Sequence, residues 1–188
     1  MIPYQIESLP LKDALLLHVP RHMDQRGFFL EAFRQMYAHH LHLPVFVQDN
    51  VSFSIQGVLR GLHFQKPPSP QAKLVTVLRG RIWDVIVDLR PSSPSYRRWH
   101  GITLTDREKY LTWIYVPVGF AHGFYVESEE ALVWYKCSAP YEPSLDGGWR
   151  WNDPTFQIEW PCKETPILSA KDAQLPFFSD KENPFRDL

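Results

Sequence analysis

The sequence predicts a mainly β protein, built as a sandwich or barrel of short strands. From about residue 45 to Asp153, short apolar runs follow one another with turn residues between them, a pattern typical of these architectures. Seventeen prolines against nine glycines favour turns, because proline interrupts helices. Hydrophobic residues make up 44% of the chain and aromatic residues 14%, which is the composition of an ordered globular protein.

The first elements are expected to be two strands and a helix. The opening residues, through Ala14–Val19, read as a strand, and Gly27–Leu30 reads as another that follows the polar turn at Asp24–Arg26. Glu31–Leu43 contains neither Gly nor Pro and spaces its apolar residues as a short helix does. Pro44 is expected to end that helix.

Strands then dominate the middle of the chain. Val51–Ile55 alternates cleanly, which places four polar residues on one face: Gln48, Asn50, Ser52 and Ser54. Leu74–Leu78 and Ile82–Leu89, joined by Arg-Gly-Arg, predict a hairpin. In its second arm Asp84 and Asp88 share a face with Ile82 and Ile86, which predicts another polar-lined surface. Further strands are expected at 99–104, 113–116, 123–126 and 131–137.

The chain of 188 residues suits a single domain spanning 1–188. We expect a core barrel at about 45–160, with the N-terminal strands and the C-terminal tail packing on it. The tail after Lys163 is polar and rich in proline, and Ser169 is a candidate cap for a helical turn there. Trp149, Trp151 and Trp160 read as core or interface residues.

Charge and cysteine content exclude several classes of protein. A net charge of −1 provides no global field for nucleic acid or a membrane, so neither is an expected partner. The chain has no basic-then-apolar signal pattern and no apolar run near eighteen residues, so we expect a soluble, cytoplasmic protein. Cys137 and Cys162 form neither a metal-type pair nor a disulfide framework, and reduced thiols are expected.

The histidines do not predict a metal site. His39, His40 and His42 contain an H-x-H, but it lies at the end of the predicted helix, where side chains two apart diverge. A surface helix end, where cationic groups suit the helix dipole, explains them better. His63 and His122 have no second histidine two residues away.

The segment Gln48–Gln65 is the strongest local sign of a functional site. It crowds Gln, Asn, Ser, Arg and His around a turn with glycine, and buried polar groups are costly unless paired, so such a cluster usually lines a wet cavity. Strict alternation sends Arg60 and His63 to opposite faces of a strand. A bulge at Gly61 would bring them together, and glycine in a strand often marks one.

Local patterns leave the roles of several residues open. A core histidine bonded to backbone is the usual reading of His63, but Arg60, Gln65 and Lys73 lie close to it in sequence and argue against that reading. His122, in the tight turn and strand of Pro117–Phe124, reads equally as a capping or packing histidine. Tyr135 reads as core with its hydroxyl bonded. Lys73 could extend to solvent, and Asp172 could be a solvated loop acid.

Taken together, these segments resemble the dTDP-4-dehydrorhamnose 3,5-epimerases, a cupin-fold family of deoxysugar biosynthesis. The matching segments follow one another in one order and spacing over nearly the whole chain. They are residues 24–29, 48–65, 71–75, 84–90, 93–94, 117–124, 135–136, 151–154, 158–161 and 168–172.

The resemblance implies an all-β cupin-type jelly-roll barrel with a few short helices at the periphery, assembled as a homodimer. It implies an isomerase that uses no metal and no cofactor. The implied substrate is a dTDP-4-keto-6-deoxyhexose, dTDP-4-dehydro-6-deoxy-D-glucose, which is inverted at carbons 3 and 5 to give dTDP-4-dehydro-L-rhamnose.

The resemblance also implies roles for individual residues. His63 is the expected base, with Asp172 orienting its imidazole; Tyr135 is the expected acid on the other face of the sugar, and Lys73 faces the carbonyl oxygen. The implied substrate-binding residues are Arg26, Glu31, Gln48, Asn50, Arg60, His122, Tyr141, Asp146 and Lys171. Asp146 departs from the family, which commonly has Glu there, so its side chain is shorter by a methylene.

Three other functions remain open at this point. The first is inversion at a single carbon of this or a related dTDP-4-keto-deoxysugar. The second and third are a sugar-binding cupin without activity and a cupin with metal chemistry. The presence of His63, Tyr135, Lys73 and Asp172 together argues against a protein that only binds sugar.

Overall fold

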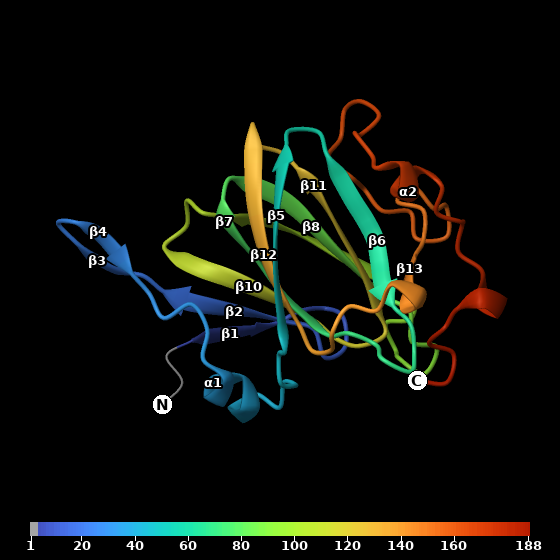
Figure 1. Ribbon diagram of the computed structural model, residues 1–188, viewed down its shortest axis with the longest axis horizontal. Coiled ribbons are helices and arrows are strands. Elements are labelled where there is room, and N and C mark those ends of the chain that lie inside the picture. The colour runs from blue at the N-terminus through green and yellow to red at the C-terminus, as the bar shows by residue number, and fades with distance from the viewer. Residues whose placement is uncertain (1–3) are drawn as a thin grey trace.

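Two β-sheets packed face to face make up most of the molecule, as the computed structural model of residues 4–188 shows (Figure 1). The six-stranded sheet has the order β1-β2-β10-β7-β12-β5 and the five-stranded sheet the order β13-β6-β11-β8-β9. A separate hairpin of β3 and β4 projects beyond the sheets. The prediction of a mainly β protein is confirmed. No helix within residues 4–188 is long and apolar enough to cross a membrane.

The strands of the six-stranded sheet are β1 (Gln5–Ser8), β2 (Leu15–Pro20), β10 (Tyr110–Val116), β7 (Lys73–Arg79), β12 (Glu130–Cys137) and β5 (Gln48–Ile55). Those of the five-stranded sheet are β13 (Asp146–Gly148), β6 (Leu59–Gln65), β11 (Phe120–Val126), β8 (Arg81–Asp88) and β9 (Trp99–Thr105). The hairpin consists of β3 (His22–Asp24) and β4 (Gly27–Phe29). The strands expected at 99–104, 113–116, 123–126 and 131–137 are therefore all present.

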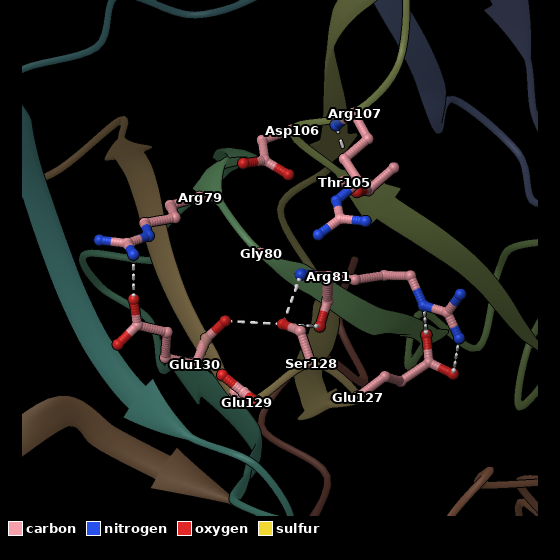
Figure 2. Close-up of a pocket in the computed structure, with 10 residues that line it drawn as sticks. All are labelled: Arg79, Gly80, Arg81, Thr105, Asp106, Arg107, Glu127, Ser128, Glu129 and Glu130. Carbon is pink, nitrogen blue, oxygen red and sulfur yellow. Dashed lines mark hydrogen bonds and ion pairs between the residues drawn. The ribbon is translucent and has the colours of Figure 1, made fainter.

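The predicted hairpin of Leu74–Leu78 and Ile82–Leu89 is wrong. Both strands exist as β7 and β8, but β7 pairs with β10 and β12, whereas β8 pairs with β9 and β11. The chain turns from one sheet into the other at Gly80, whose φ of +89° suits glycine. A Cβ there would lie 2.1 Å from the carbonyl oxygen of Glu130, and the Ser128 hydroxyl accepts from the Arg81 N–H beside it (Figure 2).

The predicted helix Glu31–Leu43 is too long. Helix α1 covers only Gln35–His40, and Arg34 before it is extended, with φ −140°. Tertiary contacts hold the preceding residues out of the helix, because the Ala32 carbonyl accepts a hydrogen bond from Trp113 Nε1 at 2.9 Å. His39 and His40 lie in the last turn of α1, as expected for a surface helix end.

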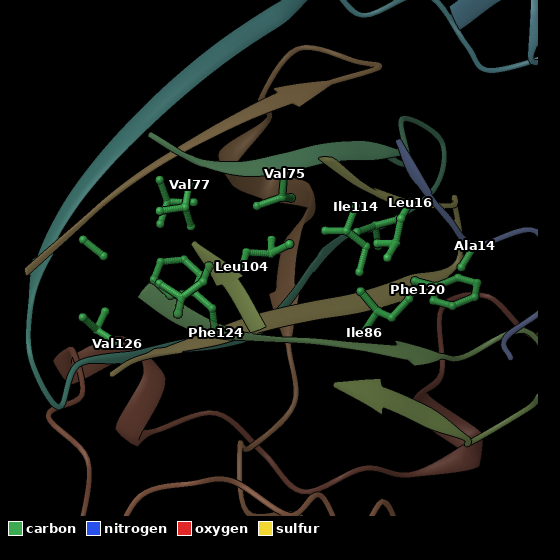
Figure 3. Close-up of a cluster of buried hydrophobic side chains, with 14 of the residues drawn as sticks. Ala14, Leu16, Val75, Val77, Ile86, Leu104, Ile114, Phe120, Phe124 and Val126 are labelled. Atoms are coloured by element: carbon green, nitrogen blue, oxygen red, sulfur yellow. The ribbon is translucent and has the colours of Figure 1, made fainter. Parts of the chain in front are cut away.

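The core lies between the two sheets (Figure 3). Apolar side chains from β2, β7, β10 and β12 meet those from β8, β9 and β11, and burying such side chains is the main favourable term in folding. The cluster includes Leu16, Val75, Val77, Ile82, Ile86, Leu104, Ile114, Phe120, Phe124 and Val133. The next subsection describes a polar region between the two sheets.

The outer faces of both sheets are also covered in part. On the five-stranded sheet, Trp149, Phe156 and Phe185 from the C-terminal part of the chain pack over Leu62 and Val87. On the six-stranded sheet, residues near α1 pack over Trp113 and neighbouring side chains. The prediction that Trp149 is a core residue is confirmed, since it is 3% exposed.

The C-terminal part of the chain returns to the five-stranded sheet. The 3₁₀ helix η1 (Pro143–Leu145) leads into β13, and later α2 (Ala170–Ala173) and the 3₁₀ helix η2 (Asp180–Glu182) follow. Ser169 caps α2 as predicted, because its Oγ accepts from the Asp172 N–H at 3.0 Å. A single bridge between Val58 and Ile167 holds this segment beside β6.

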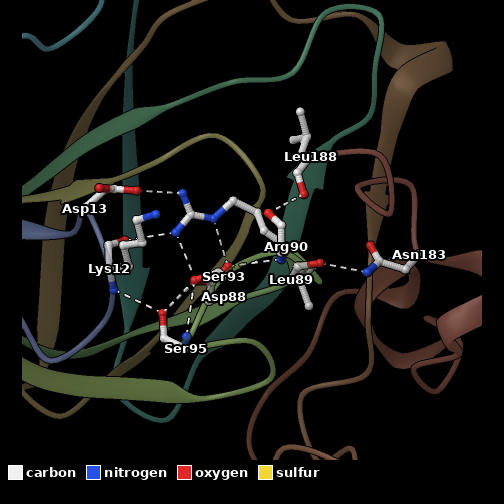
Figure 4. Close-up of polar contacts among 10 residues, drawn as sticks. Lys12, Asp13, Asp88, Leu89, Arg90, Ser93, Ser95, Asn183 and Leu188 are labelled. Carbon is white, nitrogen blue, oxygen red and sulfur yellow. Dashed lines mark hydrogen bonds and ion pairs between the residues drawn. The ribbon is translucent and has the colours of Figure 1, made fainter.

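Asp88 belongs to a buried structural network and not to a polar-lined surface, so that part of the prediction is wrong. Its carboxylate accepts hydrogen bonds from Arg90, Ser93 and Ser95, and Arg90 also pairs with Asp13 at 2.9 Å (Figure 4). Burial alone would raise the pKa of Asp88, but these hydrogen bonds outweigh it and hold the pKa below its ordinary value. The network ties the end of β8 to the loop before β2.

We predict that Asp88→Asn lowers the free energy of unfolding by about 3 kcal/mol, because it leaves Arg90 without its buried partner. Folding lowers the pKa of Asp88. The carboxylate therefore stabilises the wild-type protein at pH values above the ordinary carboxyl pKa, and this stabilisation is lost as the pH falls through the lowered pKa of the folded state. Urea unfolding at neutral and acid pH measures both effects. Glu130→Gln, at the exposed Arg79 pair, is the control and should cost less than about 1 kcal/mol; equal losses would contradict the prediction.

Candidate active site

A polar cavity lies between the sheets and consists of two adjacent parts that share three residues. The larger part has a volume of about 330 Å³ and the smaller about 160 Å³. His63, Lys73 and Tyr135 line both. The larger part is also lined by Gln48, Asn50, Phe64, Gln65, Gln71, Cys137, Tyr141, Asp146 and Lys171, and the smaller by Ser52, Arg60, His122 and Phe124.

The predicted bulge in β6 is confirmed. His63 pairs with His122 and Arg60 with Phe124, so three steps along β6 match two steps along β11. Gly61, with φ +129°, takes up the extra residue. A Cβ at Gly61 would lie 2.6 Å from the Gly123 Cα, so this close approach of β6 and β11 requires glycine. As a result, Arg60 and His63 line the same cavity.

His63 forms a dyad with Asp172. Its Nε2 lies 2.6 Å from Asp172 Oδ1, and the Asp172 side chain is 4% exposed. Burial alone would raise the pKa of Asp172, but the contacts with His63, Gly61 and Ser169 outweigh it and lower the pKa. Asp172 is therefore a buried carboxylate on α2, and no local sequence pattern distinguished it from a solvated acid.

Tyr135 faces the same cavity from the opposite sheet. It lies on β12 of the six-stranded sheet, whereas His63 lies on β6 of the five-stranded sheet. Burial, followed by the neighbouring Cys137, raises the pKa of the Tyr135 phenol, so the hydroxyl remains protonated at neutral pH. One imidazole and one neutral phenol thus approach the cavity from its two walls.

Lys73 lines the cavity together with these two groups. It begins β7 and lines both parts of the cavity, so it does not extend to bulk solvent. Burial lowers the pKa of its ammonium group, with smaller opposing effects from Cys137 and Asp146. A lysine held in this way stabilises negative charge that develops on a ligand beside it.

His122 forms a second histidine–carboxylate pair. Its Nε2 lies 2.8 Å from Asp84 Oδ2, and the Asp84 side chain is completely buried on β8. The remaining Asp84 oxygen, Oδ1, has no hydrogen-bond partner within residues 4–188. Asp84 thus holds the cavity residue His122 in place. The sequence pattern placed Asp84 on a polar-lined face, but Asp84 was not among the expected site residues.

Three predicted binding residues lie together at one end of the larger part of the cavity. Asp146 accepts a hydrogen bond from the Tyr141 hydroxyl at 2.9 Å and forms an ion pair with Lys171. Burial would raise the pKa of Asp146, but these partners lower it. Despite the shorter side chain, Asp146 reaches both neighbours, and the Tyr141 ring remains 52% exposed.

The polar face of β5 faces the cavity, as the alternating pattern predicted: Gln48, Asn50 and Ser52 line it. Gln48 donates to Asn50 Oδ1 at 3.0 Å and accepts from the backbone N–H of Tyr141, and both residues line the larger part. Arg60 donates to Ser54 Oγ at 3.0 Å and to the Phe53 carbonyl oxygen. These contacts hold the Arg60 guanidinium at the rim of the smaller part.

Arg26 and Glu31 are not brought to this cavity by their own chain. Arg26 lies on the β3–β4 hairpin, which projects beyond the sheets (Figure 1), and its side chain is 90% exposed. It pairs only with Asp24 beside it, and Glu31 pairs with Arg34. Neither residue lines the cavity.

Seven residues near or in the cavity were not among the expected site residues: Ser52, Phe64, Gln65, Gln71, Asp84, Phe124 and Cys137. Alternation placed Ser52 on the polar face with Asn50 without giving it a role, and alternation with Tyr135 would have selected Cys137. Phe124 is otherwise part of the apolar core, so its sequence context carries no sign of a second role.

A second charged cleft, of about 570 Å³, lies at the turns around Gly80 (Figure 2). Two of its arginines form ion pairs within the cleft, Arg79 with Glu130 and Arg81 with Glu127, and none of its lining residues is a histidine, lysine or tyrosine. Within residues 4–188, no three His, Cys, Asp or Glu side chains gather in a group that could hold a metal ion.

The chain matches known proteins over nearly its whole length. The family model described as dTDP-4-dehydrorhamnose 3,5-epimerase matches residues 8–180. The dTDP-4-dehydrorhamnose 3,5-epimerase of Methanothermobacter thermautotrophicus is 43% identical over 175 residues, which cover 92% of this chain and 93% of that protein.

Solved structures agree with these matches. The crystal structure of dTDP-4-dehydrorhamnose 3,5-epimerase from Elizabethkingia anophelis has a TM-score of 0.88 and 41% identity, covering 96% of this chain and 99% of that one. The Legionella pneumophila dTDP-6-deoxy-D-glucose-3,5-epimerase, in complex with dTDP-4-keto-L-rhamnose, has a TM-score of 0.87 and 40% identity, covering 93% and 92%. The prediction of a cupin-like jelly roll is confirmed by this likeness.

Proposed function

Since the chain belongs to the dTDP-4-dehydrorhamnose 3,5-epimerase family, we propose that it inverts carbons 3 and 5 of dTDP-4-dehydro-6-deoxy-D-glucose. The product is dTDP-4-dehydro-L-rhamnose. One observation carries the proposal: His63 and Tyr135 stand on opposite sheets and face one cavity. Inversion requires a proton to leave one face of a ring carbon and to return on the other, so it needs two groups placed in this way.

His63 acts as the base. Both inverted carbons lie next to the ketone at carbon 4, so loss of either proton gives an enolate. Because Nε2 of His63 is engaged by Asp172, its Nδ1 carries the lone pair that accepts the proton. Asp172 holds the imidazole in this orientation and balances the charge it gains, as carboxylates do in other histidine dyads.

Lys73 stabilises the enolate. A carbon acid next to a ketone is very weak, and a base at neutral pH removes its proton only if the developing oxyanion is stabilised. Lys73 supplies a cation that lines both parts of the cavity together with His63 and Tyr135. His122, held by Asp84 at 2.8 Å, lies beside His63 on β11 and contacts the same part of the sugar.

Tyr135 returns the proton on the opposite face. Its phenol is a donor because burial keeps the pKa above the ordinary value. After carbon 3 or carbon 5 receives this proton, the ketone reforms and the carbon is inverted. His63 then releases the proton it took to water, and the Tyr135 phenolate takes one up from water. With both groups reset, the same two transfers at the second carbon give the L-configured sugar.

The nucleotide half of the substrate binds along the larger part of the cavity. The exposed Tyr141 ring offers a flat face for thymine, and Lys171, Asp146, Gln48 and Asn50 supply polar contacts. Arg60, which lines the smaller part, suits the diphosphate, because its fork makes paired, charge-assisted hydrogen bonds. The names of the matched relatives favour inversion at both carbons over inversion at one.

We also propose that the enzyme is a homodimer. The outward face of the edge strand β5 exposes Val51, Phe53 and Ile55, each by more than half, and the β3–β4 hairpin exposes Phe28 and Phe29. Exposed apolar groups of this size mark protein contacts. In a dimer, the hairpin of one protomer would bring its Arg26 and Glu31 to the partner's cavity, which explains why neither lines the cavity of its own chain.

A cytoplasmic location is part of the proposal. Cys137 and Cys162 are free thiols, which suits a reducing compartment.

We predict that His63→Ala prevents solvent deuterium from entering carbons 3 and 5 of the keto-sugar in heavy water, because the base is lost. Tyr135→Phe should retain some exchange and lose inversion by at least about 10²-fold, because only the opposite-face donor is missing. NMR of the sugar protons measures both. His100→Ala and Tyr115→Phe, on β9 and β10 outside the cavity, are matched controls that should keep both activities. Undiminished exchange in His63→Ala would reject His63 as the base.

The dimer proposal predicts complementation between two impaired variants. Arg26→Ala should weaken turnover, and His63→Ala should abolish it. When the two proteins are unfolded together and refolded as mixed dimers, one cavity combines an intact His63 with an intact Arg26 from the partner, so activity should return. If the mixture is no more active than the separate proteins, Arg26 does not act in the partner's cavity.

A further inference from the structure

The hydroxyl of Ser52 is a buried polar group without a partner. Ser52 lies on β5 and lines the smaller part of the cavity with His63, Tyr135 and His122. Its Oγ is buried and makes no hydrogen bond within residues 4–188. A buried hydroxyl left unpaired costs about 1–3 kcal/mol, and such a group in a native protein calls for an explanation.

The neighbouring serine shows that this face of β5 can satisfy its hydroxyls. Ser54 lies two residues further along the same face, and its Oγ accepts a hydrogen bond from Arg60 Nε at 3.0 Å. Ser52 therefore differs from Ser54 in lining the cavity while its buried hydroxyl has no side-chain partner within residues 4–188. A cavity lined by polar groups is where a ligand would complete such a hydrogen bond.

The strand register places Ser52 beside the catalytic groups. Tyr135 pairs with Asn50 across β12 and β5, and Val133 pairs with Ser52. Ser52 is thus one step along the cavity face from the Asn50–Tyr135 pair, within the reach of diagonal cross-strand neighbours. It lies on the side away from Gln48, whose side chain contacts Tyr141 at the nucleotide end.

We propose that Ser52 is a substrate-contacting residue whose hydroxyl forms a hydrogen bond with a hydroxyl group of the sugar ring. The proposal rests on the proposed function, because it requires the sugar to lie between His63 and Tyr135. A serine hydroxyl both donates and accepts, so it matches a sugar hydroxyl in either direction. No role for Ser52 followed from the family resemblance.

This contact would fix how the ring is rotated between the two walls. His63 and Tyr135 approach the ring from opposite sheets, so they do not by themselves determine which ring carbon faces them. A hydrogen bond from β5 at a third position restricts that rotation. Correct placement of reacting atoms contributes strongly to rate, so loss of the contact should lower turnover more than it lowers binding of the nucleotide.

The test is Ser52→Ala, with turnover of the dTDP-4-keto-6-deoxy sugar, affinity for dTDP alone and unfolding in urea all measured. We expect kcat/KM to fall about tenfold, the effect of one hydrogen bond between neutral groups. Affinity for dTDP should not change, since dTDP has no sugar ring at this position. Stability should not fall, because the hydroxyl makes no bond in the free protein.

Thr76→Val is the matched control. The Thr76 hydroxyl is also buried, but it donates to the Thr112 carbonyl oxygen at 2.7 Å and lies outside both parts of the cavity. It should lose stability and retain kcat/KM, the opposite of Ser52→Ala. Ser52→Cys, which keeps the volume but donates weakly, provides a second variant and should show the same selective loss.

Three results would overturn the inference: unchanged kcat/KM in Ser52→Ala, an equal loss of affinity for dTDP, or a loss of stability like that of Thr76→Val. A wild-type protein that does not turn over the keto-sugar would overturn the proposed function first and this inference with it. The two failures are therefore distinguishable in one set of measurements.

Discussion

The close approach of β6 and β11 at Gly61 and Gly123 is the constraint on which the site depends. A Cβ at Gly61 would lie 2.6 Å from the Gly123 Cα, and one at Gly123 would lie 2.8 Å from the Arg60 carbonyl oxygen. Two facing glycines therefore permit the bulge that shifts the register between His63 and Arg60. Without that shift, alternation would direct one of these side chains out of the cavity, and the base would be separated from the proposed diphosphate contact.

The two sheets divide the chemistry between them. The five-stranded sheet carries His63, and α2 brings Asp172 to it from the C-terminal part of the chain. The six-stranded sheet carries Tyr135 and Lys73. The sandwich thus holds the proposed base and the proposed acid on opposite walls, which suits inversion better than a single mobile residue would, because neither group has to cross the ring.

Alternation, turn residues and strand-breaking glycine predicted much of the fold. They gave most of the strands, the polar face of β5 and the bulge at Gly61. They did not predict β3 or β13, and they read the opening residues through Val19 as one strand where β1 and β2 are separate. These patterns failed where contacts between residues far apart in sequence determine the local structure. The turn at Gly80 resembles that of a hairpin, but it joins strands of two different sheets. Contacts such as that of Trp113 with Ala32 keep Glu31–Arg34 out of the helix. Asp172 was recognisable only by family resemblance, because a local pattern does not show what a tail residue reaches. The structure places Arg26 and Glu31 away from the cavity of their own chain, which no sequence pattern predicted.

A crystal structure of this protein with dTDP-4-keto-L-rhamnose bound would test the central claim most directly. The account predicts that the pyranose lies between the two sheets, with His63 Nδ1 facing one side of the ring and the Tyr135 hydroxyl facing the other. Each of these atoms should lie close to carbon 3 or carbon 5. A ring with both groups on the same face, or a sugar bound away from both, would contradict it.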